Sequence, residues 1–226
     1  MQHIWYVICN KHTKYIIKMD KKRISVAFVG VYEQNLSFIP AFSPDFCKNL
    51  FHQPATTVFG ITPDGFVITI EKRQMPLVVV AQNKISVRTQ EEDTLTQILK
   101  SVVEELKKSG VSLKCSAFGL NYEYQWLQMQ EPAEIWMQKR FIKRDLLKTA
   151  KLQSCQQISF RAEINATELV NLTIEPRAGV NDGLYANVNH HHILQSEDIP
   201  QPEKLKELFV RSITQTENIL SELIRE

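Results

Sequence analysis

The chain alternates twice between stretches with a two-residue hydrophobic period and stretches with a helical period. In the first half, apolar and polar residues alternate as expected for half-buried β-strands. The predicted strands are residues 24–31, 56–62, 66–71, 77–81 and 84–89. Pro63-Asp64-Gly65 predicts a hairpin turn, because proline presets the first turn dihedral and glycine accepts a positive φ.

A helical period follows these strands. Its apolar residues recur at spacings of three and four, which places them on one helix face. They are Leu95, Ile98, Leu99, Val102, Val103 and Leu106. Asp93 or Thr94 is the expected N-cap, and Gly110 ends the pattern. The sequence therefore predicts a helix over 94–108.

Strands followed by a helix recur further along the chain. We expect a strand from Ser112 to about Leu127, interrupted at Gly119, and a helix over 131–151. Further strands are expected over 157–164, 169–175 and 184–193, before a long amphipathic helix over 203–226. Residues 1–18 are either an upstream mis-start or an edge strand over Trp5–Cys9.

These patterns predict an α+β fold in which helices cover one face of one or more antiparallel sheets. The two halves share their order of elements without residue-level identity, so the repetition is either a coincidence or an internal duplication. We expect a β-rich N-terminal half over 1–130, a basic connecting helix over 131–156 and a hairpin region with a long helix over 157–226, or one continuous domain.

Composition narrows the class of protein. The 226 residues are 43% hydrophobic, which is enough for a core, and the formal net charge of +2 gives no overall field that would attract nucleic acid or lipid. The four cysteines lie far apart in the sequence, and we expect them to be free thiols in a reducing compartment. No apolar run approaches the roughly 20 residues of a membrane span. We therefore expect a cytoplasmic protein.

Three consecutive histidines, His190 to His192, suggest metal binding. Pairing Leu172 with Val188 keeps the apolar face of the hairpin together, and this register places His190 and His192 at the end of that face. Two histidines fall short of the four ligands of a structural zinc site. A hydrogen-bonded histidine pair at a strand end is therefore the main interpretation, and a metal site at His190 and His192 is the alternative.

A basic stretch occupies the predicted helix over 131–151. Spacings of three and four place its positive side chains on one face, where they could follow phosphates. These residues are Arg140, Arg144, Lys148 and Lys151. A solvated helix face is the simpler interpretation, because the total charge is nearly balanced.

Aromatic residues alternate with polar ones at Tyr122, Tyr124 and Trp126. Such a row can stack on bases or a ligand when exposed. Leu120 continues the same face, so we expect these side chains to form core between sheet and helix.

Common catalytic and nucleotide-binding motifs are missing from the sequence, among them G-x-S-x-G, H-E-x-x-H and the P-loop. We therefore expect a non-enzymatic binding or assembly protein that needs no cofactor and forms a homodimer or a complex with another protein. The alternatives are nucleic-acid binding through the basic residues and a metal-dependent enzyme at His190 and His192. Substrate, partner identity and biological process do not follow from the sequence.

Overall fold

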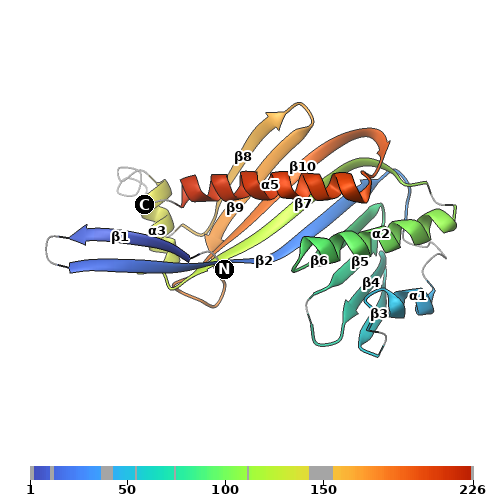
Figure 1. The fold of residues 1–226 in the computed structure, drawn as a ribbon, viewed down its shortest axis with the longest axis horizontal. Helices are drawn as coiled ribbons and strands as arrows, with labels where there is room; N and C mark the ends of the chain where they lie inside the picture. Colours follow the sequence, from blue (N-terminus) through green and yellow to red (C-terminus); the bar gives the residue numbers. More distant parts are fainter. Residues whose placement is uncertain are drawn as a thin grey trace. The chain divides into compact units, whose positions relative to one another are not determined.

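The computed structural model describes residues 3–10, 13–36, 43–53, 55–73, 75–110, 112–142 and 155–224, with side chains from residue 20 onward. Strands and helices combine in an α+β fold built on an antiparallel sheet, as the sequence predicts (Figure 1). Within the described residues, no helix combines the length and the apolar character that crossing a membrane would require.

Paired strands follow the order β3-β4-β5-β6-β2-β7-β10-β9-β8. The first repeat consists of β2 (Thr13–Tyr32), α1 (Pro44–Asn49), β3 (Thr57–Thr62), β4 (Gly65–Ile70), β5 (Leu77–Ala81), β6 (Lys84–Thr89) and α2 (Glu92–Lys108). The second repeat consists of β7 (Lys114–Leu127), α3 (Ala133–Phe141), β8 (Ile158–Asn165), β9 (Glu168–Pro176), β10 (Leu184–Asp198) and α5 (Pro202–Leu223).

The two repeats share part of their topology, although the first has five strands and the second has four. In each, the last strand returns to pair with the first, and β2 and β7 are neighbours in the middle of the strand order. The long helix of each repeat follows its last strand, and α2 and α5 cover the same face of the sheet (Figure 1). The predicted order of strands followed by a long helix thus occurs twice, and the duplication itself stays a prediction. β1 (His3–Asn10) lies outside it and pairs with β2 as an N-terminal hairpin.

The strands of the first repeat form because their apolar residues alternate. Val26 and Phe28 of β2 are fully buried, and the β-strands β3 to β6 form an antiparallel meander. Gly65 at the start of β4 lets β5 approach closely, because a Cβ there would come within 1.9 Å of the Val80 carbonyl oxygen. The residues around Pro44 form α1, with the Ser43 side chain accepting a hydrogen bond from the Phe46 N–H.

Helix α2 packs on the sheet with a wholly aliphatic face. The buried residues of this face are Leu95, Ile98, Leu99, Val102 and Leu106. The helix begins at Glu92 with Glu91 as N-cap, so the prediction of Asp93 or Thr94 as the cap is wrong. The apolar stripe itself was predicted correctly.

In the second repeat, β7 runs without a break. The predicted interruption at Gly119 is wrong, because the neighbouring Asn189 side chain fills the space above it: a Cβ at Gly119 would lie 2.7 Å from Asn189 Oδ1. Tyr122, Tyr124 and Trp126 are buried. The aromatic row is core, as expected.

Backbone hydrogen bonds at both ends of the β9–β10 hairpin agree with the predicted register. The Arg177 N–H donates to Gly183 O at 2.8 Å, and the Ile193 N–H donates to Thr167 O at 2.8 Å. Both bonds fit the pairing of Leu172 with Val188. His190 and His192 are buried at the end of the apolar face, whereas His191 is partly exposed.

Helix α3 ends at Phe141, where Ile142 takes an extended conformation. One continuous helix over 131–151 is therefore wrong, and residues 143–154 lie outside the described part of the chain. Phe141 packs between Trp136 and Phe160, with ring centroids 5.8 Å apart in each case. The end of α3 thus lies against β8.

The chain divides into two compact units, each assembled from three stretches. One contains residues 1–24, 123–162 and 171–188; the other contains residues 25–122, 163–170 and 189–226. The second unit contains both α2 and α5.

Candidate functional site

Polar side chains gather where α5 packs on the sheet. We call this group the polar cluster: Tyr122, Glu168, His190, Arg211, Ser212 and Thr216. All except Arg211 are almost fully buried. Strands β7, β9 and β10 each supply one residue and α5 supplies three, so the cluster joins the helix to the sheet.

A carboxylate, an imidazole and a hydroxyl follow one another through the cluster. Glu168 Oε1 lies 3.5 Å from His190 Nδ1, and His190 Nε2 lies 2.9 Å from Thr216 Oγ1. The first contact is electrostatic rather than a well-formed hydrogen bond. A carboxylate opposite Nδ1 favours the tautomer with the proton on Nδ1, and Nε2 then accepts from the Thr216 hydroxyl.

Two further contacts complete the cluster. Arg211 Nη2 donates to Glu168 Oε2 at 2.7 Å, and the guanidinium is half exposed while the carboxylate is buried. The Ser212 hydroxyl donates to the Leu208 carbonyl, so the Tyr122 hydroxyl donates to Ser212 Oγ. Arg211 therefore compensates a buried negative charge.

Burial governs protonation of the two histidines. It lowers the pKa of His190; Glu168 opposes this shift and Arg211 adds to it. Burial also lowers the pKa of His192 to about 4, and the ring stacks on Phe118 with centroids 4.5 Å apart. Both histidines are therefore neutral at pH 7, because burial in the folded protein disfavours the protonation of each ring.

The carboxylate–imidazole–hydroxyl order is that of an acid, base and nucleophile in hydrolases. A nucleophile must reach its substrate, however, and Thr216 and His190 are both 0% exposed. The cluster therefore lacks the access that catalysis requires. Its chemistry is that of a buried network that fixes where α5 sits on the sheet.

The predicted metal site remains a prediction. His190 and His192 lie on the same buried face, but the ring nitrogens of His190 face Thr216 and Glu168. In the part of the chain that the structure describes, no three His, Cys, Asp or Glu side chains gather as metal ligands.

The predicted basic face also remains a prediction. Arg140 is exposed in the last turn of α3. Arg144, Lys148 and Lys151 lie outside the described residues. Because α3 ends at Phe141, the helical spacing that placed all four on one face does not extend unbroken through them.

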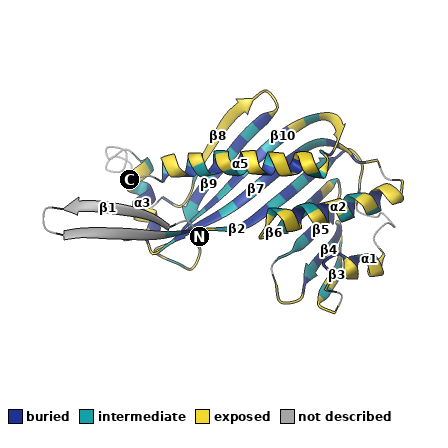
Figure 2. Cartoon of the chain, in the orientation of Figure 1, coloured by how far each residue is buried: buried dark blue, intermediate teal, exposed yellow. Residues whose placement is uncertain are grey.

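A second feature is the terminal strand β8. Seven of its eight residues are exposed, from Ser159 to Asn165, so the strand is wet on both faces (Figure 2). Two large apolar side chains are among them: Phe160 is 37% exposed and Ile164 is 41% exposed. Among the described residues, no strand pairs with the outer edge of β8.

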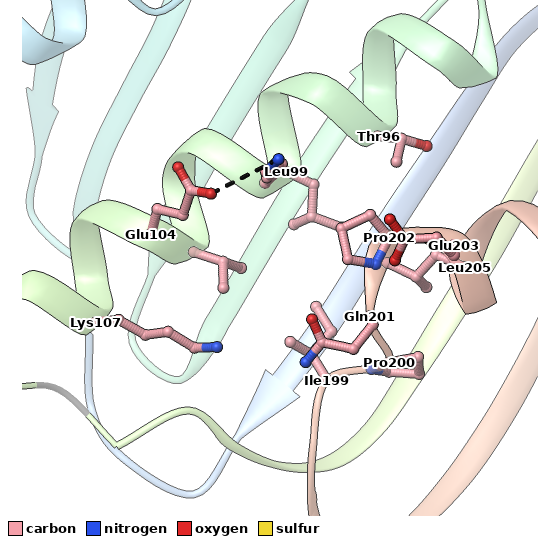
Figure 3. Close-up of a pocket in the computed structure, with 12 residues that line it drawn as sticks. Thr96, Leu99, Glu104, Lys107, Ile199, Pro200, Gln201, Pro202, Glu203 and Leu205 are labelled. Atoms are coloured by element: carbon pink, nitrogen blue, oxygen red, sulfur yellow. Dashed lines mark ion pairs between the residues drawn. The ribbon is translucent and has the colours of Figure 1, made fainter.

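A pocket lies between α2 and the chain segment that enters α5. Leu99 and Leu205 supply apolar walls, while Glu104, Lys107 and Gln201 supply polar groups (Figure 3). Its volume of about 210 Å³ is below the range of typical ligand pockets, which is roughly 300–1,000 Å³. We assign no ligand to it.

Sequence reasoning identified His190 and missed most of its partners. Glu168 was detectable as a carboxylate on the apolar face of β9, which continues through Val170 and Leu172. Ser212 and Thr216 were detectable as small polar residues four positions apart within the apolar stripe of α5. Their contact with β7 and β10 depends on strand order, which the sequence did not supply.

Comparison with known proteins adds no family: no protein-family model matches the chain, and no curated protein matches it either.

Proposed function

We propose that the protein is a non-catalytic binding protein that holds a protein partner by strand addition at β8. The observation that carries this proposal is the eight-residue terminal strand whose outer edge is unpaired within the described chain and whose side chains are almost all exposed. Backbone N–H and C=O groups along such an edge can pair with another strand.

Features that normally protect an edge are scarce in β8. Natural proteins block edges with proline, with charged side chains and above all lysine, with very short strands or with a covering helix. β8 contains neither proline nor lysine, its two charged residues Arg161 and Glu163 are of opposite sign, and it is longer than the mean strand of about 5–6 residues. Its exposed Phe160 and Ile164 offer apolar contacts to a pairing strand.

The polar cluster and the pocket beside α2 both support binding rather than catalysis. The one acid–base–hydroxyl sequence that we find in the described chain is buried beneath α5. The pocket beside α2 is small. A partner held by backbone pairing needs neither a catalytic group nor a ligand pocket.

Proline variants in β8 test the proposal. Adjacent residues of a strand direct their N–H groups to opposite sides, so one of Ala162→Pro and Glu163→Pro removes an outward donor and the other removes a bond to β9. Thermal unfolding identifies the variant that keeps the fold. The full-length tagged chain is then recovered from its native cells, with Ile61→Pro at the opposite terminal strand, β3, as the matched control.

We expect the native chain and the control to retain the same partner, and the folded β8 variant to lose it. A second, differently tagged copy of the chain counts as a partner. Retention by the folded β8 variant, or no partner with the native chain, contradicts the proposal.

A further inference from the structure

The residue order of β8 contains its own complement. Phe160-Arg161-Ala162-Glu163-Ile164 reads as apolar, positive, small, negative, apolar. Phe160, Ala162 and Ile164 share one face of the strand, and Arg161 and Glu163 share the other. Within the described chain, neither Arg161 nor Glu163 takes part in an ion pair.

Antiparallel pairing of β8 with a second β8 satisfies every one of these side chains when Ala162 faces Ala162 of the partner copy. Arg161 then faces Glu163 of the other copy and Glu163 faces Arg161, which gives two opposite-charge pairs. Phe160 faces Ile164 in the same way, twice. Directly opposed side chains in antiparallel strands are close enough to form such contacts.

Neighbouring registers lack this complementarity. Centring the pair on Arg161 places two arginines face to face, and centring it on Glu163 places two glutamates face to face. Centring between Arg161 and Ala162 pairs Phe160 with Glu163. Like charges directly opposite one another are destabilising, so the charge pattern selects the register centred on Ala162.

We infer that the partner of β8 is a second copy of this chain, joined in a two-fold antiparallel pairing centred on Ala162. This inference rests on the proposed function of β8 as a binding edge. The same strand serves both copies, so the interface is isologous and closes as a dimer. Opposite charges at its exposed face make the dimer weaker at high salt.

Charge-reversal variants test the inference in the full chain. Arg161→Glu and Glu163→Arg each replace two attractive pairs with two repulsive ones, and we expect self-association to weaken about tenfold or more for each. An equimolar mixture of the two variants restores attraction across the interface, and so does the double variant Arg161→Glu/Glu163→Arg. Sedimentation velocity measures all five samples, including the native chain, and thermal unfolding confirms that each is folded.

Cross-linking tests the register. In a background with Cys9→Ser, Ala162→Cys should form a disulfide-linked dimer on mild oxidation, because the two thiols face each other. Ile164→Cys is the matched control, since its thiols would lie about 13 Å apart at roughly 3.4 Å per residue. The three described native cysteines are buried.

A folded native chain that stays monomeric over the whole accessible concentration range overturns the inference. So does a dimer that both charge reversals leave unchanged, or one that cross-links through Ile164→Cys rather than Ala162→Cys. If the chain is monomeric but proline in β8 still abolishes capture of another protein, the proposed function stands and only the choice of partner fails.

Discussion

The two repeats hold their long helices on the sheet by different means. α2 buries only aliphatic side chains, from Leu95 to Leu106. α5 buries Leu205, Phe209 and Leu220 at its ends and Ser212 and Thr216 between them, and these two hydroxyls bond to the sheet. The surface that α2 buries against the sheet is thus apolar, and the surface that α5 buries is partly polar. We call them the apolar seat and the polar seat.

A buried polar contact contributes less net stability than an apolar one of similar size, because its groups lose their bonds to water. It is also more selective, since a displaced helix leaves its partners unsatisfied. The comparison therefore indicates that α5 is fixed in position by the polar cluster and that its attachment responds to pH. The side chains that α2 itself buries do not titrate.

The two terminal strands of the sheet, β3 in the first repeat and β8 in the second, also differ. β3 has six residues, no charged side chain and a glycine in its middle. β8 has eight residues and the charge pattern that permits pairing with itself. Glu168 of the polar cluster begins β9, directly after the turn that follows β8. The second repeat thus combines a precisely anchored hairpin with a binding edge.

Truncating a buried apolar side chain of either long helix has the largest expected effect on stability. The effect should be similar in the two repeats. Leu95→Ala in α2 and Leu220→Ala in α5 each remove a buried side chain, so the free energy of unfolding should fall by about 3 kcal/mol in both cases. Urea denaturation measures it. A loss below roughly 1 kcal/mol at either site would show that the helix is not seated there as described.

Acid should weaken the second repeat selectively. The pKa of an unfolded histidine is near 6.5 and burial lowers the pKa of His192 to about 4, so the unfolded chain binds more protons between these values. The free energy of unfolding should therefore fall as the pH drops from about 6.5 to about 4, by about 3 kcal/mol. His192→Phe should remove the share of this dependence that His192 contributes and leave the share of His190, whose pKa burial also lowers. Leu95→Ala should leave the dependence intact. A pH dependence in His192→Phe as large as that of the native chain contradicts the assignment.

Removing Arg211 sharpens the comparison between buried and exposed ion pairs. Arg211→Met leaves the buried Glu168 carboxylate without its cation, and we expect a loss of about 2 kcal/mol after allowing for the half-exposed guanidinium. Lys206→Met is the control, since its ion pair with Asp93 is exposed and should be worth less than about 1 kcal/mol. Equal losses in the two variants would argue against a role for burial.

The smallest effect concerns a single hydroxyl. Thr216→Val keeps the shape of the side chain and leaves His190 Nε2 unsatisfied, so stability should fall by about 1 kcal/mol. Thr214→Val is the control on the exposed side of the same helix and should change stability by less than about 0.5 kcal/mol. Thermal unfolding at pH 7 compares them. A more stable Thr216→Val protein would mean that the polar seat is no better than an apolar one.

Local periodicity predicted most elements of the fold. The strands at 77–81 and 84–89 and the apolar stripe of α2 depend on alternation and on 3.6-residue spacing, which neighbouring residues determine. The end of α3 was not predictable in this way, because helical spacing continues past Phe141 in the sequence. The burial of Tyr122 followed from Leu120 beside it.

The candidate sites were only partly predictable. Register analysis placed His190 and His192 on the buried face, because a one-residue shift would have exposed the apolar residues. Glu168, Tyr122 and Thr216 come together only once β7, β10 and β9 are neighbours and α5 lies over them. The exposure of β8 depends in the same way on its place at the end of the strand order.

Hydrogen exchange of the two terminal strands, at low and high protein concentration, tests the account most directly. If β8 pairs with a second copy, amides in residues 158–165 exchange more slowly in concentrated protein, while those in residues 57–62 of β3 exchange at one rate in both samples. Exchange of β8 that is independent of concentration, or equal slowing in β3, would contradict the account.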